Sequence, residues 1–334
     1  MRLWVLGSGS RGNAVLLESG ETRLLVDAGF GVRELALRLT AVGVAPESIQ
    51  ACVVTHEHAD HVKGAAAASA RWGWALYATA GTAANCPALG EADARTVDAG
   101  ASFAIGEFDL RTVPTPHDAA EPVAVVVTAR RTGAQAAVCY DLGHATDAVR
   151  QAVRGVDVLV VESNHDEAML RGGPYPPSVC ARIAGRDGHL SNRAAGALTR
   201  QVAHRGLGHV VLAHLSEQCN DAALAVAEMT EALARTTFRG AVHAASQQRP
   251  VGPFAPGAGR QRAPAAVQLA VGLERRERGA APGVSRPCES GWGSRSAESR
   301  PRRGPPGRAG AAPVSPRAPG SRRSPSRPGT GRRP

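Results

Sequence analysis

Four side chains that can bind a metal ion lie within six consecutive residues: His56, His58, Asp60 and His61. They follow the apolar run 51–55, which has the composition of a buried strand. Where a strand ends and a helix begins, alternate side chains can turn inward, so that the first two histidines face one point and Asp60 and His61 face a neighbouring one. Imidazoles and carboxylates are ligands for Zn²⁺, Mn²⁺ or Fe. The spacing favours a metal site over a polar loop in which Asp60 only caps a helix.

Three further candidate ligands lie near the ends of later strand-like runs. His117, Asp141 and His214 each come at or just beyond such an end. Taken singly, each is more often structural: a loop histidine, a turn-forming aspartate and a histidine satisfied within a core. Their shared position, together with the histidine-rich segment, predicts that they complete the metal site.

The elements that must position these residues are many short strands and few helices. Residues 3–6, 14–18 and 22–26 are apolar runs separated by Gly, Ser or Asn, as expected for antiparallel strands. Helices are predicted over 32–42 and over 60–70, the latter with the aspartate at its start as N-cap. Further predicted strands cover 51–55, 75–79, 108–113, 123–129, 136–140, 156–162 and 210–213, and further helices cover 192–204 and 221–234. This pattern favours a layered α/β domain.

The chain of 334 residues divides into two parts by composition. Residues 249–334 hold 18 of the 39 basic residues, all Arg, four of the 29 acidic residues and 15 of the 23 prolines. Residues 1–248 therefore carry four more acidic than basic residues, although the whole chain has a net charge of +10. We expect a folded domain over 1–248 and a disordered tail over 249–334, because the tail has too little apolar surface to offset its ordering entropy. The tail is an electrostatic nucleic-acid binder, a solvated extension, or an artefact of a GC-rich reading frame.

Nothing in the sequence indicates secretion or membrane insertion. The first apolar run, 3–6, is too short for a signal-peptide core, and no run approaches the roughly 20 apolar residues of a membrane helix. The six cysteines are scattered without a C-x-x-C pair, which favours free thiols in a reducing compartment over a disulfide framework. We therefore expect a cytoplasmic protein without a membrane partner, and the sequence does not indicate its oligomeric state.

Several motifs resemble, in order, those of the metallo-β-lactamase fold and, more narrowly, those of its YycJ/WalJ branch. The H-x-H-x-D-H motif and the later His, Asp and His carry the general resemblance. The narrower resemblance rests on GSGSRGN at 7–13, VTHEHADH at 54–61, HDAAEP at 117–122, DLG at 141–143, VESNHD at 161–166, GHLSN at 188–192 and AHLS at 213–216. It extends from residue 1 to about residue 250, and the tail has no counterpart in it.

The resemblance implies an αββα sandwich with a dinuclear metal site at one edge of the paired sheets. In that pattern each of two metal ions has three ligands and shares a bridging aspartate: His56, His58 and His117 for one, Asp60, His61 and His214 for the other, and Asp141 between them. A water molecule that bridges the ions has its pKa lowered from about 15.7 toward neutrality and supplies a hydroxide nucleophile. We expect two divalent transition-metal ions, Zn²⁺ before Mn²⁺ or Fe.

Asp27, in the segment LVDAG, matches a buried aspartate of this family. In the family pattern that aspartate orients the first histidine pair from behind the metal ligands. The competing interpretation is a turn-forming aspartate before Gly29.

The fold hosts several kinds of hydrolase, so the reaction must be inferred from the site. Glu162 and His189 resemble the nuclease side of the superfamily, typified by RNase Z, in which a Glu orients a His near the scissile phosphate. A protonated His189, its pKa raised by Glu162, would stabilise the phosphate or protonate the leaving oxygen. Amides at a helix start near Ser191 and Asn192 would also suit a phosphate. The competing interpretation is structural: His189 is a residue at the entry to a helix, and Glu162 is the surface end of a strand. With Asp60, these two are the candidate catalytic residues.

We expect a metal-dependent phosphodiesterase or nuclease, and the YycJ/WalJ resemblance implies DNA exonuclease-like activity. The residues themselves do not distinguish DNA from RNA. Although the body is acidic, the metals and several arginines can supply a positive strip: Arg171, Arg182, Arg186 and Arg193. Tyr175 either stacks on a base or packs within its loop. The alternative is a small-molecule hydrolase acting on a thioester, lactone or cyclic nucleotide. A non-catalytic binding protein is less expected, because all seven ligand positions are filled.

Overall fold

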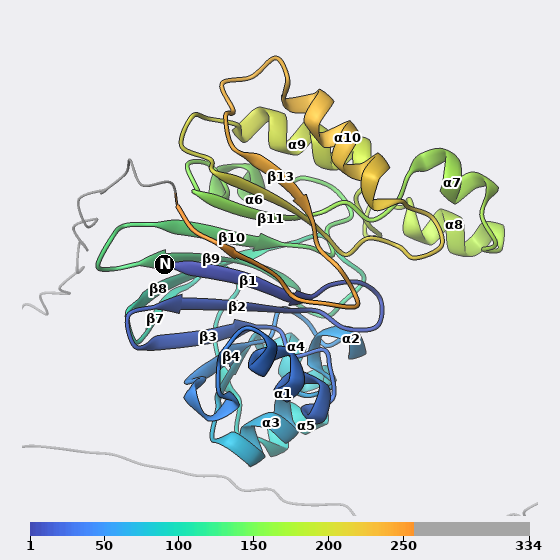
Figure 1. Cartoon of the computed structure of the whole chain (residues 1–334). Helices are drawn as coiled ribbons and strands as arrows, with labels where there is room; N and C mark the ends of the chain where they lie inside the picture. Colours follow the sequence, from blue (N-terminus) through green and yellow to red (C-terminus); the bar gives the residue numbers. More distant parts are fainter. Residues whose placement is uncertain (257–334) are drawn as a thin grey trace, which may run out of the picture. The chain divides into compact units, whose positions relative to one another are not determined.

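The computed structural model describes residues 1–256. They form two seven-stranded sheets packed face to face, with helices on the outer side of each sheet (Figure 1). This is the αββα sandwich that the resemblance implied. The predicted disorder of the tail, beyond its first residues, lies outside the described part of the chain.

The first sheet has the strand order β14-β1-β2-β3-β4-β5-β6. Its strands are β1 Arg2–Gly7, β2 Ala14–Ser19, β3 Thr22–Val26, β4 Ala51–Val53, β5 Ala75–Ala78, β6 Arg95–Thr96 and β14 Val251–Phe254. The three predicted N-terminal strands pair antiparallel, as the short turns between them require. From β3 to β6 the pairs are parallel, because longer crossover segments join those strands.

The second sheet has the strand order β13-β12-β11-β10-β9-β8-β7. Its strands are β7 Ser102–Ile105, β8 Phe108–Pro114, β9 Val123–Ala129, β10 Gln135–Cys139, β11 Val158–Glu162, β12 His209–Ala213 and β13 Ala241–Ala244. The pairs from β10 to β13 are parallel. The C-terminal ends of these strands therefore share one edge, where Asp141, Glu162 and His214 lie at or just beyond strand ends.

Helices cover the two outer faces. They are α1 Val32–Ala41, the 3-10 turn Pro46–Ser48, α2 Ala59–Val62, α3 Ala65–Trp72, α4 Ala80–Asn85, α5 Pro87–Glu91, α6 Asp147–Ala152, α7 Glu167–Gly172, α8 Pro177–Ile183, α9 Asn192–Val202 and α10 Ala222–Leu233. Side chains of α1, α3 and α5 pack on the first sheet, and those of α6, α9 and α10 pack on the second. Within residues 1–256, no helix has the length and apolar composition needed to cross a bilayer.

The central strands of each sheet are buried on both faces. In β3, Leu24 and Val26 point into the core between the sheets, whereas Leu25 points outward to the helices. In β11, Val160 lies in the core between the sheets and Leu159 lies under the helices of the second sheet. Since side chains alternate along a strand, an uninterrupted apolar run serves both layers at once.

The helix predicted over 60–70 is two helices, α2 and α3, that are separated at Gly64. The N-cap of α2 is His58, so Asp60 lies inside the helix and is not its cap. Gly64 packs so closely on the chain that a Cβ atom there would lie 2.0 Å from the carbonyl oxygen of Phe30. The break is a packing requirement that helical periodicity alone does not reveal.

The first sheet extends beyond residue 248, where the composition placed the end of the domain. The strand β14 pairs antiparallel with β1, in a register that aligns Phe254 with Leu3. The Phe254 side chain is buried between the two sheets. Proline argues against a strand in the interior of a sheet, so the prolines around this segment hid the strand in the sequence. The structure tolerates them because β14 lies at the edge of its sheet.

Candidate metal centre

All seven predicted ligand side chains lie in one cluster. In each of three overlapping groups, the ligand atoms lie within 4.8 Å of one another. The groups are His56, His58 and His117; Asp60, His61 and His214; and His56, His61 and Asp141. The first two groups are the two ligand sets that the resemblance implied. Asp141 joins them, because its Oδ2 lies 3.9 Å from Nε2 of His56 and 2.7 Å from Nε2 of His61.

The backbone is strained where two of these residues leave their strands. Asp141 follows β10 and His214 follows β12, with φ values of 52° and 53°. A residue other than glycine in the left-handed region costs about 1–3 kcal/mol, and such residues gather at functional sites. This backbone conformation directs both side chains from the second sheet toward the histidines that follow β4 of the first sheet.

The donor atoms of the cluster fit metal ions. His56 Nε2 is buried and has no hydrogen-bond partner within residues 1–256, which costs about 1–3 kcal/mol unless a ligand satisfies it. Nδ1 of His58 and Nε2 of His117 face each other at 3.2 Å, so at least one of the two nitrogens carries no proton and has a lone pair for a metal ion or a donor. A set made only of imidazole nitrogens and carboxylate oxygens suits divalent transition metals.

The protonation states of His56, His117 and Asp141 suit metal binding. Burial, and then the charge of His61, hold the pKa of His56 well below its usual value, and burial lowers the pKa of His117. Burial opposes ionisation of Asp141, but the charges of His214 and His61 outweigh it and hold the pKa of that carboxyl well below its usual range. His56 and His117 are therefore neutral beside an ionised carboxylate, which are the forms that bind metal. Burial lowers the pKa of His61 and of His214, but the charge of Asp141 outweighs it and raises the pKa of His61 well above its usual value and that of His214 to about 9, so a metal ion would displace protons from these two rings.

Asp27 is completely buried beneath the cluster, with φ at 63°. Its Oδ2 accepts hydrogen bonds from the Tyr140 hydroxyl at 2.7 Å and from Thr55 Oγ1 at 2.8 Å, and lies 2.7 Å from His61 Nδ1. Asp27 thus orients His61 directly. It reaches His56 only through Thr55, whose Oγ1 is 3.1 Å from Nδ1 of that ring. Of the first histidine pair, which the resemblance implied that Asp27 orients, only His56 is reached, and only through Thr55; the ligand that Asp27 contacts directly is His61.

Asn13 and Asn164, for which the sequence predicted no role, also position candidate metal ligands. Asn13 donates from Nδ2 to Asp60 Oδ2 at 3.1 Å and from its backbone N–H to the Asp60 carbonyl at 2.7 Å. Asn164 donates from Nδ2 to the carbonyl of His214 at 2.9 Å. Their signal in the sequence was their place in the motifs 7–13 and 161–166, which carry the resemblance without a stated role for either amide.

His189 and Glu162 form a second polar layer beside the cluster. Nδ1 of His189 lies 2.7 Å from Glu162 Oε1 and 3.2 Å from Asp141 Oδ1. Glu162 Oε2 accepts hydrogen bonds from the backbone N–H groups of Leu142 and Leu190, at 2.8 and 3.0 Å, which fixes the carboxylate. Burial lowers the pKa of His189, but the charge of Glu162 and the hydrogen bonds to both carboxylates outweigh it and raise that pKa to about 11.

A cavity of about 200 Å³ lies over the cluster and is lined by His58, Asp60, His117, Asp141, His189 and His214, among others. Because Nδ1 of His189 is directed at Glu162, Nε2 is the nitrogen left for a substrate. Asp141, Glu162, His189 and His214 also lie close enough together to form a metal-binding group of their own. A ligand role is therefore the competing assignment for His189.

The arginines predicted to form a positive strip are divided in space. Arg182 lines the cavity over the cluster. Arg171 and Arg193 line the cavity next to it. Arg186 lines neither, and Tyr175 is half-buried in the loop before α8 and lines neither.

Comparison with known proteins agrees with this geometry. Residues 22–215 match the beta-lactamase superfamily domain. The exodeoxyribonuclease WalJ of Streptococcus pneumoniae serotype 2 is 32% identical over 238 residues, which cover 69% of this chain and 87% of that protein. The exodeoxyribonuclease YycJ of Bacillus anthracis is 30% identical over 242 residues, which cover 70% of this chain and 89% of that protein.

Solved structures share the architecture. The metallo-beta-lactamase fold protein YhfI of Bacillus subtilis superposes with a TM-score of 0.55 at 18% identity, over 75% of this chain and 99% of its own. The Zn²⁺-bound PqqB of Methylobacterium extorquens superposes with a TM-score of 0.55 at 17% identity, over 75% of this chain and 100% of its own. At these identities the likeness shows the fold alone. Together with the sequence matches, it shows that the chain belongs to the beta-lactamase superfamily and, within it, to the group of metallo-β-lactamase-fold proteins that includes WalJ and YycJ.

Proposed function

We propose that this protein is a metal-dependent phosphodiesterase that acts on DNA as an exonuclease. The names of its WalJ and YycJ relatives support a DNA substrate. The observation that carries the proposal is the position of His189, which Glu162 holds beside the cluster of metal-binding side chains. A lactam or thioester hydrolase needs the metals but has no evident use for a fixed, protonated imidazole at that place.

The proposed metal site uses the two sets that the structure brings together, each of which shares Asp141: His56, His58 and His117 in one, and Asp60, His61 and His214 in the other. When bound, a pair of divalent ions lowers the pKa of a water molecule and stabilises charge on the attacking and leaving oxygens of a phosphodiester. Zn²⁺ is the proposed ion, with Mn²⁺ or Fe as alternatives for the same nitrogen and oxygen donors.

The protein's own groups then position the substrate and move a proton. Glu162 keeps Nδ1 of His189 protonated and fixes the plane of the ring. We assign to His189 a hydrogen bond to the phosphate, or proton transfer to the leaving oxygen. Asp60, whose Oδ2 is held by Asn13, has its catalytic role through the metal site.

Product analysis on end-labelled single- and double-stranded DNA and RNA tests the proposal, with Mn²⁺ or Zn²⁺ added. We expect mononucleotides from one end of DNA. Internal fragments from the first minutes of reaction would rule out exonuclease action. Turnover of a thioester, lactone or cyclic nucleotide without cleavage of DNA or RNA would support the small-molecule hydrolase instead.

We also propose that the protein works in the cytoplasm. The five cysteines within residues 1–256 are all free, which is the pattern expected in a reducing compartment. Fractionation of cells with an antibody against the protein tests this location.

A further inference from the structure

A second cavity, of about 310 Å³, adjoins the cavity over the metal cluster, and His189 lines both. Its volume falls within the range of ligand pockets, roughly 300–1,000 Å³. Its polar lining comes from the loop and helix that follow β11 and from the start of α9: His165, Glu167, Arg171, Ser191 and Arg193.

The charges around this cavity favour an anion. The Arg171 guanidinium has no hydrogen-bond or ion-pair partner within residues 1–256, and its charge acts on Glu167 from a greater distance. Arg193 pairs with Glu167, with Nη2 and Oε1 2.8 Å apart, and the Ser191 hydroxyl donates to the same Oε1 at 3.1 Å. Among the side chains that line the cavity, one carboxylate is therefore balanced by two guanidinium groups, and the N-terminus of α9 adds positive potential.

A buried imidazole in the wall is independent evidence for a ligand. His165 is only 2% exposed, and its Nδ1 is buried without a hydrogen-bond partner within the described residues. Its backbone instead forms a bridge to Ser191, which holds the residue at the start of α9. An unsatisfied ring nitrogen is costly in a core, but it is useful in the wall of a cavity that receives a polar group.

We propose that this cavity binds the phosphate group next to the scissile phosphate along the substrate strand. The proposal rests on the proposed function, because it places the scissile phosphate at the metal cluster beside His189. The neighbouring phosphate then enters the cavity that begins at the same side chain and meets Arg171, Arg193 and His165. That phosphate is either a terminal monoester or the next diester of the strand, and both offer the same anionic oxygens.

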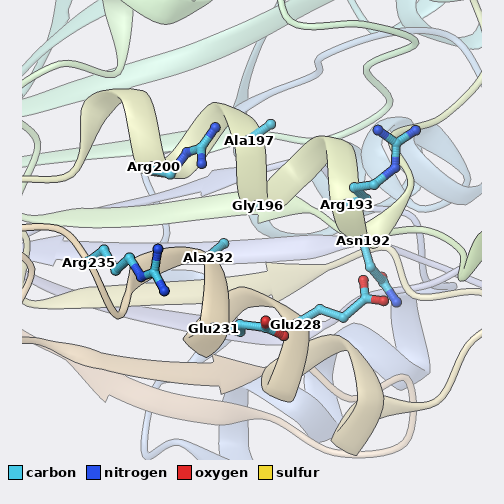
Figure 2. A pocket seen from close by; sticks show the side chains of 9 residues that line it. All are labelled: Asn192, Arg193, Gly196, Ala197, Arg200, Glu228, Glu231, Ala232 and Arg235. Atoms are coloured by element: carbon cyan, nitrogen blue, oxygen red, sulfur yellow. The ribbon is translucent and has the colours of Figure 1, made fainter.

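The groove between α9 and α10 provides the contrast and the control. This cavity, of about 500 Å³, has Arg193 and Arg200 toward its two ends and the carboxylates of Glu228 and Glu231 along the side formed by α10 (Figure 2). Arg200 lies two helical turns from Arg193, or about 10 Å along α9. Arg200→Gln removes the same charge from the same helix without touching the proposed phosphate site.

The experiment measures kcat/KM for thymidine dinucleotides with and without a terminal phosphate, at one metal concentration. We expect the wild-type protein to prefer a phosphorylated form about 10- to 100-fold, the usual effect of one or two charge-assisted hydrogen bonds. Arg171→Gln and Arg193→Gln should lower this ratio toward one. Glu167→Gln should raise it, because it releases Arg193 from its ion pair, and Arg200→Gln should leave it unchanged.

A trinucleotide with a neutral methylphosphonate beside the scissile linkage distinguishes the two sources of phosphate. If the cavity binds the internal diester, the methylphosphonate should lower kcat/KM about 10- to 100-fold in the wild type and only slightly in Arg171→Gln. A terminal phosphate should then have no effect on kcat/KM. The inference is overturned if neither change affects cleavage, or if Arg200→Gln lowers the ratio as much as Arg171→Gln. Failure to cleave any of these phosphodiesters would overturn the proposed function together with the inference.

Discussion

Hydrogen bonds from behind the cluster hold several of the candidate ligands, and this is what separates it from an ordinary polar patch. Asp27 fixes His61, Asn13 fixes Asp60, and Asn164 holds the backbone of His214. Such outer contacts orient a ligand and set its tautomer, so that its metal-binding atom points inward. With these contacts in place, loss of one ligand should empty a metal position without unfolding the chain.

His58→Ala tests the ligand sets at this scale. Its imidazole is only half-buried and lies 3.2 Å from His117, so its removal deletes a donor and leaves no large hole in the core. Elemental analysis should show about two metal ions per chain in the wild type and clearly fewer in this variant, with loss of hydrolysis. His243→Ala, on β13 and outside the ligand sets, is the control and should retain its metal. A wild-type metal content in His58→Ala would contradict the assignment.

His189→Ala separates chemistry from metal binding. Because we assign His189 to the substrate, this variant should keep its metal and lose about 10²- to 10⁴-fold in turnover of DNA. A p-nitrophenyl diester should lose less, since its leaving group needs little protonation. Glu162→Gln acts through the same imidazole, so the double variant should lose much less than the product of the two single losses. Lost metal would make His189 a ligand, and unchanged turnover would remove it from the mechanism.

The elements that carry the first ligands are packed more closely than their sequence indicates. The turn of helix α2 carries Asp60 and His61 and ends at Val62. Gly64, two residues further on, donates its N–H to the carbonyl of Ala28 at 2.8 Å. Ala28 directly follows Asp27, so the same contact ties the helix turn to the buried aspartate that orients His61. The short helix and the end of β3 therefore form one unit around the metal site.

Gly64→Ala should destabilise the protein, because the added Cβ would lie 2.0 Å from the carbonyl oxygen of Phe30. Overpacking of this kind costs about 1–3 kcal/mol in free energy of unfolding, measured by urea denaturation. The matched control is Gly90→Ala in α5, where an added Cβ would have no atom within 4 Å among the described residues. Alanine is the better helix former, so the control should be neutral or slightly stabilising. Equal stability of the two variants would mean that the close approach is absent in solution.

At the scale of the whole molecule, the site exists because two sheets present loops at a common edge. A strand of the first sheet, β4, is followed by the ligands His56, His58, Asp60 and His61. Strands of the second sheet, β10 and β12, are followed by Asp141 and His214. The apolar core between the sheets, which includes Phe254 of the last described strand, fixes their relative position. Removal of that strand should therefore weaken the sandwich as a whole.

Two truncations locate the end of the domain. A chain that ends at residue 256 keeps β14 and should unfold at the same temperature as the full chain. A chain that ends at residue 248 loses the burial of Phe254 and its pairing with β1, and should unfold at a clearly lower temperature. Loss of a buried Phe side chain alone costs about 3–5 kcal/mol. Equal thermal stability of the two truncations would mean that β14 contributes little.

The chain that ends at residue 256 also tests whether the residues beyond it bind nucleic acid, which is one of the three alternatives for the tail. Turnover of a small phosphodiester should be unchanged in the chain that ends at residue 256. If affinity for DNA at low salt falls while that turnover persists, the tail acts as an electrostatic tether. Reduced turnover of the small substrate would show that residues beyond 256 belong to the catalytic domain.

The sequence by itself determined the donors and most of the elements. The types and spacing of the residues from His56 to His61 predict a metal site, and apolar runs predict strands such as 123–129, which the structure confirms as β9. These signals are local, because a strand or a ligand motif consists of residues that lie within one short segment of the chain. The αββα architecture came from the resemblance of several motifs taken in order, which no single segment carries.

Only the tertiary structure decided which side chains meet. Asp27 contacts His61 and reaches His56 only through Thr55, and the helix after the metal motif breaks at Gly64 because another segment lies against it. The strand β14 joins the sheet although its composition is that of a turn, because it pairs at an edge where proline is tolerated. The second cavity beside His189 likewise combines residues after β11 with the start of α9. These contacts join residues that are not neighbours in the chain, so they depend on how strands, loops and helices pack within each layer and leave no periodic signal in the sequence.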